Sequence, residues 1–346
     1  MQKVEEDKAE VRKCFSELDG RYLSVAFALS LIIATISTAV ARIGRIILGN
    51  QVPASDFRVA WKPIADAVRN GAPLYLQGTG DNKPPLFHLL NLFLSGFDAY
   101  FAVFILIIGL VNGVSAILLW RLLGKYGRIG TGMTASVLFV FSLPVIKAHY
   151  IQSGSFAVLF ILSSLIVRRG LLSGILVALA GLFYQYAVLL VPFVLWVQIR
   201  DREREAQIYW GASYLIGGVI TLATVFILIA IIYSPRAALA GLYWSYGLPT
   251  GVTSEPIADF IHPPGSYAAR LWIITDTIRW AKLGFLQFRY LFPLLIPAIF
   301  ATYIEFIDKN TDFGAKMVFL MIGGGLPLLF RTWADYSLLL LPFLCA

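Results

Sequence analysis

Long apolar runs, separated by short charged segments, make up most of the chain. A run of about 20 apolar residues is long enough to cross the hydrocarbon core of a bilayer as a helix. The pattern predicts an all-α, polytopic membrane protein, because helices satisfy their own backbone groups in lipid. We expect about ten transmembrane or half-membrane helices within one multi-pass domain, residues 1–346. The predicted helices cover residues 22–41, 99–120, 130–146, 153–167, 171–183, 186–199, 208–233, 290–307, 316–330 and 336–346.

Two neighbouring runs are too short to cross a bilayer separately. Residues 171–183 and 186–199 meet at Phe183-Tyr184-Gln185-Tyr186, where polar and aromatic side chains interrupt the apolar sequence. Non-helical backbone at membrane depth is tolerated where it is buried in protein or lines a cavity. The break therefore indicates either a contact with substrate or a simple packing kink.

Three segments lie outside the predicted spans. Residues 1–21 mix acidic and basic side chains, unlike a signal peptide, so we expect a cytoplasmic segment that the mature protein keeps. Residues 42–98 form a first outer loop with interfacial helices, and residues 234–289 form a second long outer loop. The last run stops at Ala346, before it is long enough to span, which predicts a chain truncated at its C-terminus.

Basic residues in the short loops predict the orientation of the protein. They gather on the same side of the threading as the N-terminus, in three loops: Arg121, Lys125 and Arg128; Arg168 and Arg169; Arg200, Arg202 and Arg204. Short cytoplasmic loops are enriched in Lys and Arg. We therefore expect a cytoplasmic N-terminus in the plasma membrane and an active site on the outer face.

Composition agrees with a membrane protein and excludes several other classes. Hydrophobic residues are 58% and charged residues 14% of the chain, against roughly 45–50% and about 25% in soluble domains. The mean hydropathy is +0.76. The net charge of +8 is distributed over membrane loops, which does not indicate a nucleic-acid partner. Cys14 and Cys345, at opposite ends of the chain, offer neither a disulfide framework nor metal-ligand spacing.

The first outer loop begins with an amphipathic segment. Ser55 or Asp56 can cap a helix that ends near Gly71. An apolar stripe with spacings of three and four contains Phe57, Trp61, Ile64, Ala65 and Val68. Charged side chains fall on the other side: Lys62, Asp66 and Arg69. Such a helix is suited to lying in the plane of the membrane interface.

A double proline follows Lys83 in the same loop. Pro84 and Pro85 cannot lie inside a helix, so they predict an extended backbone before a second apolar stretch, residues 86–97. Asp56 and Lys83 are therefore each expected at the boundary of an element on the outer surface.

This arrangement resembles the membrane-embedded C-type (GT-C) glycosyltransferases. It is most similar to the branch with the aminoarabinose, protein-O-mannosyl and polyprenol-phosphate-dependent mannosyl transferases. The resemblance rests on Asp56 soon after the first span, on the interfacial helix, on Gly71-Ala72-Pro73-Leu74-Tyr75 and on Lys83-Pro84-Pro85-Leu86. It implies transfer of a sugar from a polyprenyl-phosphate donor to a lipid, glycan or protein acceptor. By resemblance, Asp56 is the catalytic base and Lys83 holds the donor phosphate.

The chemistry of this transfer suggests further candidates for binding the donor phosphate. One carboxylate is enough for an inverting displacement, and cations stabilise the departing phosphate. Arg58 and Arg331 are candidates to assist Lys83, and Arg270, Arg279 and Arg289 are either further helpers or contacts to lipid headgroups.

Two other stretches resemble the same family. They are residues 150–197 and Arg331-Thr332-Trp333-Ala334-Asp335-Tyr336, and they complete the set of substrate-binding candidates: His88, Tyr184, Gln185, Asp335 and Tyr336. The family often has an acidic residue in the turn before the first helix of this region. Residues 149–155 contain none, so a divalent metal ion stays open as a cofactor but no residue of this turn supports a site for it.

The residues leave other interpretations open. Asp56 is also a common helix cap, and Lys83 is also a common interface anchor. The alternative function is a transporter or flippase for an anionic lipid-linked substrate, and a third is a non-catalytic membrane scaffold. A transferase predicts that Asp56 and Lys83 face one cavity at the membrane boundary. A transporter predicts a polar path that continues to the midplane.

Overall fold

A computed structural model describes residues 2–49, 56–126, 129–144, 151–248, 250–252, 294, 296, 298–299, 311–327 and 338–346, with only the backbone for residues 2–22. This part of the chain is helical and contains no β-strand. In chain order the helices are α1 (Gln2–Leu48), the π-helix η1 (Phe57–Trp61), α2 (Lys62–Arg69), α3 (Pro85–Leu94), α4 (Tyr100–Lys125), α5 (Ile129–Ser142), α6 (Gly154–Ile166), α7 (Gly170–Phe183), the 3-10 helix η2 (Gln185–Leu190), α8 (Val191–Ile199), α9 (Arg204–Ile232), α10 (Pro235–Tyr246), α14 (Thr311–Gly325) and α16 (Leu341–Cys345).

Three helices of the described residues are long and apolar enough to cross a membrane. They are Leu23–Leu48 within α1, Tyr100–Lys125 and Arg204–Ile232. Shorter apolar helices, among them α5, α6 and α7, coincide with predicted runs but have 10–17 residues, and a helix rises only about 1.5 Å per residue. The predicted all-α fold is therefore confirmed in the described part, which contains three candidate membrane spans, and the count of about ten spans stays a prediction.

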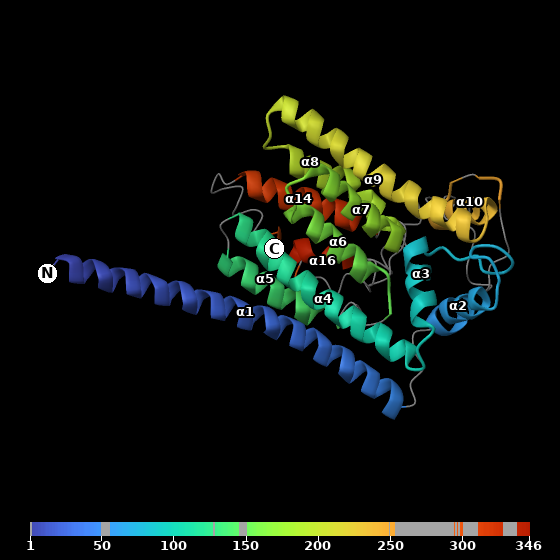
Figure 1. Cartoon of the computed structure of the whole chain (residues 1–346), viewed down its shortest axis with the longest axis horizontal. Coiled ribbons are helices and arrows are strands. Elements are labelled where there is room, and N and C mark those ends of the chain that lie inside the picture. The colour runs from blue at the N-terminus through green and yellow to red at the C-terminus, as the bar shows by residue number, and fades with distance from the viewer. Residues whose placement is uncertain are drawn as a thin grey trace.

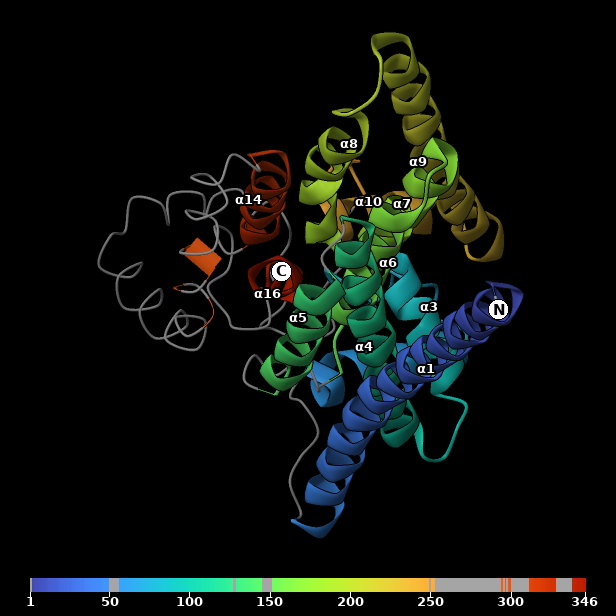
Figure 2. The same ribbon diagram turned by 90° about the vertical axis from the view of Figure 1, so that its left-hand side faces the viewer.

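The helices form a bundle with two distinct ends. One end gathers α2, α3 and α10, and we name residues 56–99 and 233–248 the first-loop end (Figure 1). The opposite end holds the short connections between spans, and we name residues 121–126, 163–170, 198–204 and 311–316 the basic-loop end. Helix α1 lies along one side of the bundle and α9 along another, with α14 and α16 beside α5 and α8 (Figure 2).

Glycines hold α1 and α9 against the bundle. A Cβ atom on Gly174 would lie 1.9 Å from the Tyr214 carbonyl oxygen, so the backbones of α7 and α9 are in direct contact. A Cβ atom on Gly113 would lie 2.7 Å from Thr35 Oγ1 and 3.0 Å from Ile32 Cα, so α4 also packs closely on α1. Close backbone packing of this kind associates helices in lipid, where hydrophobic burial gives no advantage.

The first helix differs from its predicted bounds at both ends. It begins at Gln2 and continues to Leu48, so residues 42–48 extend the helix beyond its predicted end at residue 41. The apolar side chains of Ile43, Ile46 and Ile47 explain the extension. Arg42 is consequently part of the helix and is 7% exposed.

The predicted break after Phe183 is present. Helix α7 ends there, Tyr184 is extended (φ −144°, ψ 107°), and η2 leads into α8. The Phe183 ring stacks on Phe156 of α6, with centroids 4.6 Å apart. Pro192, in the first turn of α8, favours a helix start at this point.

Candidate functional site

The amphipathic segment of the first-loop end folds as η1 and α2. Its predicted apolar stripe is buried, and Lys62 pairs with Asp66 (2.6 Å) on the exposed side. Asp56 precedes η1, is exposed and has helical dihedral angles, and its side chain makes no capping hydrogen bond. The helix therefore does not use the Asp56 carboxylate as a cap, and Ser55 lies outside the described residues.

Two residues in the turn after α2 have an unfavourable backbone conformation. Tyr75 (φ 68°) and Gln77 (φ 51°) both adopt the left-handed conformation, which side chains other than glycine rarely take. Thr79 Oγ1 donates to the carbonyl oxygens of Pro73 (2.8 Å) and Leu76 (2.5 Å) and holds the turn closed. Strained residues persist only where the surrounding structure fixes them.

The backbone of Lys83 is fixed by two hydroxyl groups. Tyr75 Oη donates to the Lys83 carbonyl oxygen (2.7 Å), and Ser245 Oγ from α10 donates to the same oxygen (3.2 Å). Tyr75 is completely buried, and Gly241 of α10 leaves the space for its ring. Burial raises the pKa of Tyr75 well above its usual value, so the phenol stays neutral and remains a donor.

The side chain of Lys83 lies over an aromatic face. Its Nζ atom is 5.4 Å from the centroid of the Trp61 ring, a cation–π distance. Among the described residues, no Asp or Glu carboxylate lies within ion-pair distance of this ammonium group. Pro84 is extended and Pro85 is the first residue of α3, as the double proline predicted. The lysine is thus a positioned cation whose charge no acidic side chain of this part neutralises.

Asp81 and His88 form a buried pair beside Lys83. His88 Nε2 lies 3.2 Å from Asp81 Oδ2, and the two side chains are 1% and 3% exposed. These two atoms are within ion-pair distance, but they are not aligned as in a hydrogen bond. Asp81 Oδ1 accepts from the backbone N–H of Asn82 (2.7 Å), and the Tyr75 ring packs edge-on against His88. The pair connects the loop before Lys83 to α3.

Sequence reasoning missed Asp81 as a site residue and named His88 only as a substrate contact. Asp81 stands in Gly78-Thr79-Gly80-Asp81-Asn82, a composition typical of an exposed turn. Asn91 of α3 was also missed, and its Nδ2 donates to the Trp61 carbonyl oxygen (2.7 Å). No local pattern predicts either contact, because both depend on how α3 packs on η1.

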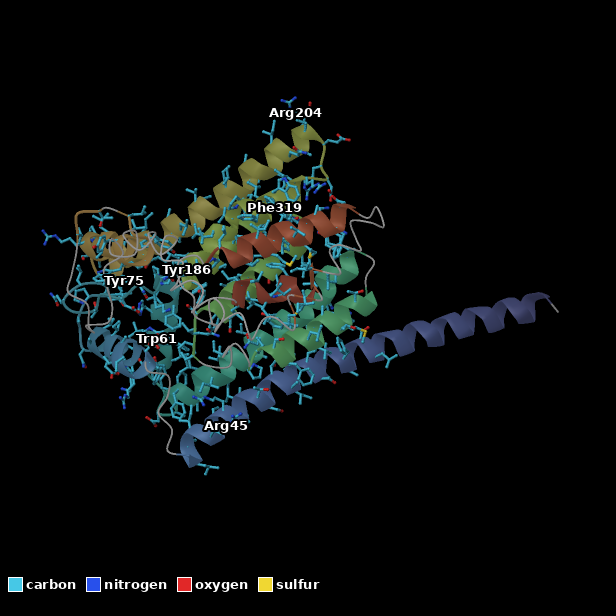
Figure 3. The ribbon with its side chains drawn as sticks, turned by 180° about the vertical axis from the view of Figure 1, so that it is seen from behind. Arg45, Trp61, Tyr75, Tyr186, Arg204 and Phe319 are labelled. Carbon is cyan, nitrogen blue, oxygen red and sulfur yellow. The ribbon has the colours of Figure 1, made fainter. Side chains whose placement is uncertain are left out.

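Helix α10 connects the first loop to the break between α7 and η2. Ser245 bonds to Lys83, and the next residue, Tyr246, donates from Oη to the Gly181 carbonyl oxygen (3.1 Å). Tyr184 is buried and packs edge-on against Tyr186, while Gln185 Oε1 is buried with no hydrogen-bond partner among the described residues. Trp61, Tyr75 and Tyr186 lie together at this end, away from Arg204 (Figure 3).

The structure describes some of the predicted site residues and not others. Asp56, the exposed Arg58, Lys83 and His88 belong to the first-loop end, and Tyr184 and Gln185 adjoin it. Arg331, Asp335 and Tyr336 lie outside the described residues, as do Arg270, Arg279 and Arg289. Within the described part, no group of three His, Cys, Asp or Glu side chains could hold a metal ion.

A small recess lies between α1, α4 and α5. It is lined by Thr35, Thr38, Asn112 and apolar neighbours, and its volume is ≈ 10 Å³. This is room for about one water molecule. The recess by itself does not form a path for a lipid-linked substrate.

Comparisons of the chain with protein-family models, with curated proteins and with solved structures gave no match. The resemblance to C-type glycosyltransferases rests on the residues of the chain.

Proposed function

We propose that the chain is a membrane-embedded C-type glycosyltransferase that moves a sugar from a polyprenyl-phosphate donor to an acceptor at the outer face of the membrane. One observation supports this function above others. Lys83 is held by its backbone, lies over Trp61 and has no carboxylate partner in the described part of the chain. A fixed cation at the end of apolar helices suits a phosphate group carried by a membrane lipid.

The proposed reaction is an inverting displacement. The acceptor hydroxyl oxygen forms a bond to the anomeric carbon of the sugar, and the bond from that carbon to the donor phosphate oxygen breaks. Asp56 takes the hydroxyl proton, and the electron pair of the broken bond leaves with the polyprenyl phosphate. Lys83 stabilises the negative charge that grows on this phosphate, with Arg58 and Arg331 as assisting cations.

The arrangement around Lys83 supports this role through preorganisation. A lysine side chain is flexible, so its contribution to a transition state depends on how well its backbone is held. Tyr75, Ser245 and the Asp81–His88 pair fix that backbone from three elements. The proposal includes a plasma-membrane protein of about ten spans with a cytoplasmic N-terminus, and a lipid, glycan or protein acceptor.

Sugar transfer by purified protein in proteoliposomes tests the proposal. The assay uses a panel of radiolabelled polyprenyl-phosphate sugars with wild type, Asp56→Asn and Lys83→Gln. We expect rate losses of about 100-fold or more for both variants, the usual effect of removing a catalytic base or a charge-stabilising group. Lys62→Gln is the matched control, because Lys62 is an exposed lysine of the same end that pairs with Asp66.

Two different outcomes of this assay would contradict the proposal, and they have different meanings. If the folded wild type transfers sugar from none of the donors, the result would favour a transporter or flippase of an anionic lipid-linked substrate. Transfer that is intact in Asp56→Asn and Lys83→Gln would keep the enzyme class and remove both residues from the site.

A further inference from the structure

Three cations of the basic-loop end come from three different connections between helices. Lys125 ends α4, Arg168 lies between α6 and α7, and Arg202 lies between α8 and α9. In the described part of the chain, none of them has a carboxylate within ion-pair distance. We name Lys125, Arg168 and Arg202 the basic cluster.

Local contacts bring the basic cluster together from three segments. The Arg202 guanidinium lies over the Trp210 ring (5.1 Å to the centroid), and Trp210 Nε1 donates to the Arg168 carbonyl oxygen (3.1 Å). Lys125 Nζ reaches the Leu165 carbonyl oxygen (3.4 Å), at the end of α6 just before Arg168. Arg168 and Arg202 are close enough to repel Lys125 electrostatically. The three segments that carry Lys125, Arg168 and Arg202 therefore lie next to one another, and the three like charges interact.

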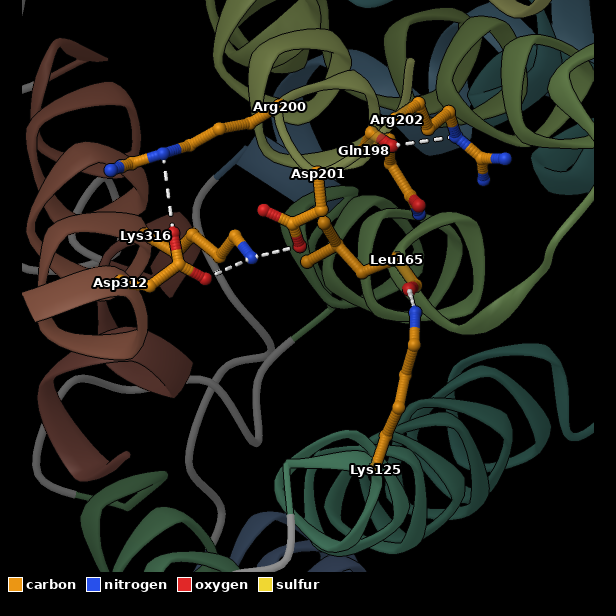
Figure 4. A network of polar contacts seen from close by, with 8 residues as sticks. All are labelled: Lys125, Leu165, Gln198, Arg200, Asp201, Arg202, Asp312 and Lys316. Carbon is orange, nitrogen blue, oxygen red and sulfur yellow. Dashed lines mark hydrogen bonds and ion pairs between the residues drawn. The ribbon is translucent and has the colours of Figure 1, made fainter. Parts of the chain in front are cut away.

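The nearby carboxylates are engaged elsewhere. Figure 4 shows Lys316 between Asp201 and Asp312, and Arg200 Nε lies 3.2 Å from Asp312. Asp201 also attracts Lys125 across the cluster, without an ion-pair contact. Glu203 and Glu205 are exposed, as are Arg169 and Arg204 in the same turns. Asp201 and Asp312 thus pair with Lys316 and Arg200, and within the described part of the chain no carboxylate forms an ion pair with the basic cluster.

We propose that the basic cluster binds the phosphate headgroup of an anionic membrane phospholipid. Arginine guanidinium groups present paired donors that match phosphate oxygens, and a basic site at the ends of membrane helices lies at headgroup depth. Trp210 is buried, and its ring positions the Arg202 guanidinium from the protein side. Exposed apolar side chains flank the site and offer contacts to acyl chains: Leu171, Leu172, Ile208 and Tyr209. These flanking contacts favour a lipid over a free phosphate ion.

A purely structural role makes a different prediction. Cations near the C-terminal end of a helix also stabilise its carbonyl groups, and Lys125 already reaches one at the end of α6. In that role the three residues would affect folding stability and would not distinguish anionic from zwitterionic lipids.

Lipid binding to the full purified chain separates these roles. Native mass spectrometry measures the affinity for phosphatidylglycerol and for phosphatidylcholine, with wild type beside the double variant Arg168→Gln/Arg202→Gln. We expect about fivefold weaker phosphatidylglycerol binding for each charge removed, or about 30-fold together, and an unchanged affinity for phosphatidylcholine. The matched control, Arg45→Gln/Arg236→Gln, removes two exposed arginines outside the basic cluster and should leave both affinities unchanged.

Three results would overturn the proposal. The first is unchanged phosphatidylglycerol affinity in the cluster variant, and the second is an equal loss in the control, which would indicate general electrostatic attraction. The third is displacement of the lipid by inorganic phosphate at equal concentration, which would assign the site to a free ion. If the double variant does not fold, Lys125→Gln alone is expected to weaken binding about fivefold, and an unchanged affinity would again contradict the proposal.

Discussion

The first-loop end is held together by buried and mostly neutral groups, whereas the basic-loop end is held by charged groups that are partly exposed. At the first-loop end, the hydroxyls of Tyr75 and Ser245 converge on one carbonyl oxygen, and the Asp81–His88 pair is almost inaccessible to water. At the basic-loop end, Asp201 and Asp312 are 60% and 49% exposed where they meet Lys316.

The difference shows how each end responds to change. A buried polar group that loses its partner stays without a hydrogen bond, because water cannot replace it. A half-exposed carboxylate that loses its partner regains water, and salt already weakens its ion pairs. The first-loop end should therefore be the more sensitive to a single substitution, which suits a region proposed to position a phosphate-binding lysine.

The largest effect is expected from Asp81→Ala. This change leaves His88 buried without its partner, and breaking a buried pair costs about 3–5 kcal/mol of unfolding free energy. Denaturant unfolding of the purified protein in detergent measures it. Asp98→Ala, at an exposed position of the same end, is the control and should change stability by less than about 0.5 kcal/mol. Similar values for the two variants would mean that the pair does not hold the loop.

A smaller loss is expected from Lys316→Met at the other end. The variant removes both ion pairs of a lysine whose side chain is 1% exposed, but each carboxylate is about half exposed and becomes hydrated. We expect a loss of about 1–2 kcal/mol that shrinks in 0.5 M salt. Thermal unfolding at low and high salt provides the measurement. A loss as large as that of Asp81→Ala would remove the proposed contrast between the two ends.

The smallest effect on stability is expected from Tyr75→Phe. Ser245 still donates to the Lys83 carbonyl oxygen in this variant, so the loss should be only about 1 kcal/mol. Adding Ser245→Ala leaves that oxygen without either donor, and the double variant should lose more than the sum of the two single variants. Additive losses in the double-mutant cycle would show that the two hydroxyls act independently.

Local sequence patterns predicted the elements well and their contacts poorly. The spacing of Phe57, Trp61 and Ile64 specifies one face of a helix, so the buried stripe could be found without a structure. The break at Tyr184 could be found because polar residues interrupt an apolar run. The partners of Tyr75 could not be found, because Ser245 lies 170 residues further along the chain and no periodicity relates the two.

Charge patterns indicated which basic loops lie together, but they did not predict which charged residues form contacts with each other. The clustering of Arg168 with Arg202 followed from the rule that basic loops share one side of the membrane. That Lys316 pairs with Asp201, and that Arg202 lies over Trp210, depends on how α14 and α9 pack on the bundle. The site residues near the C-terminus, Arg331 and Asp335, remain predictions.

The bond between Ser245 and Lys83 has a consequence for the biogenesis of the protein. A ribosome releases Lys83 well before Ser245, and the helices from α4 to α9 are synthesised in the interval. Throughout that time the first loop lacks one of the two donors that fix its lysine. Docking of α10 supplies the missing donor and joins the loop to α7, so the proposed donor site matures late, after the intervening helices have been made.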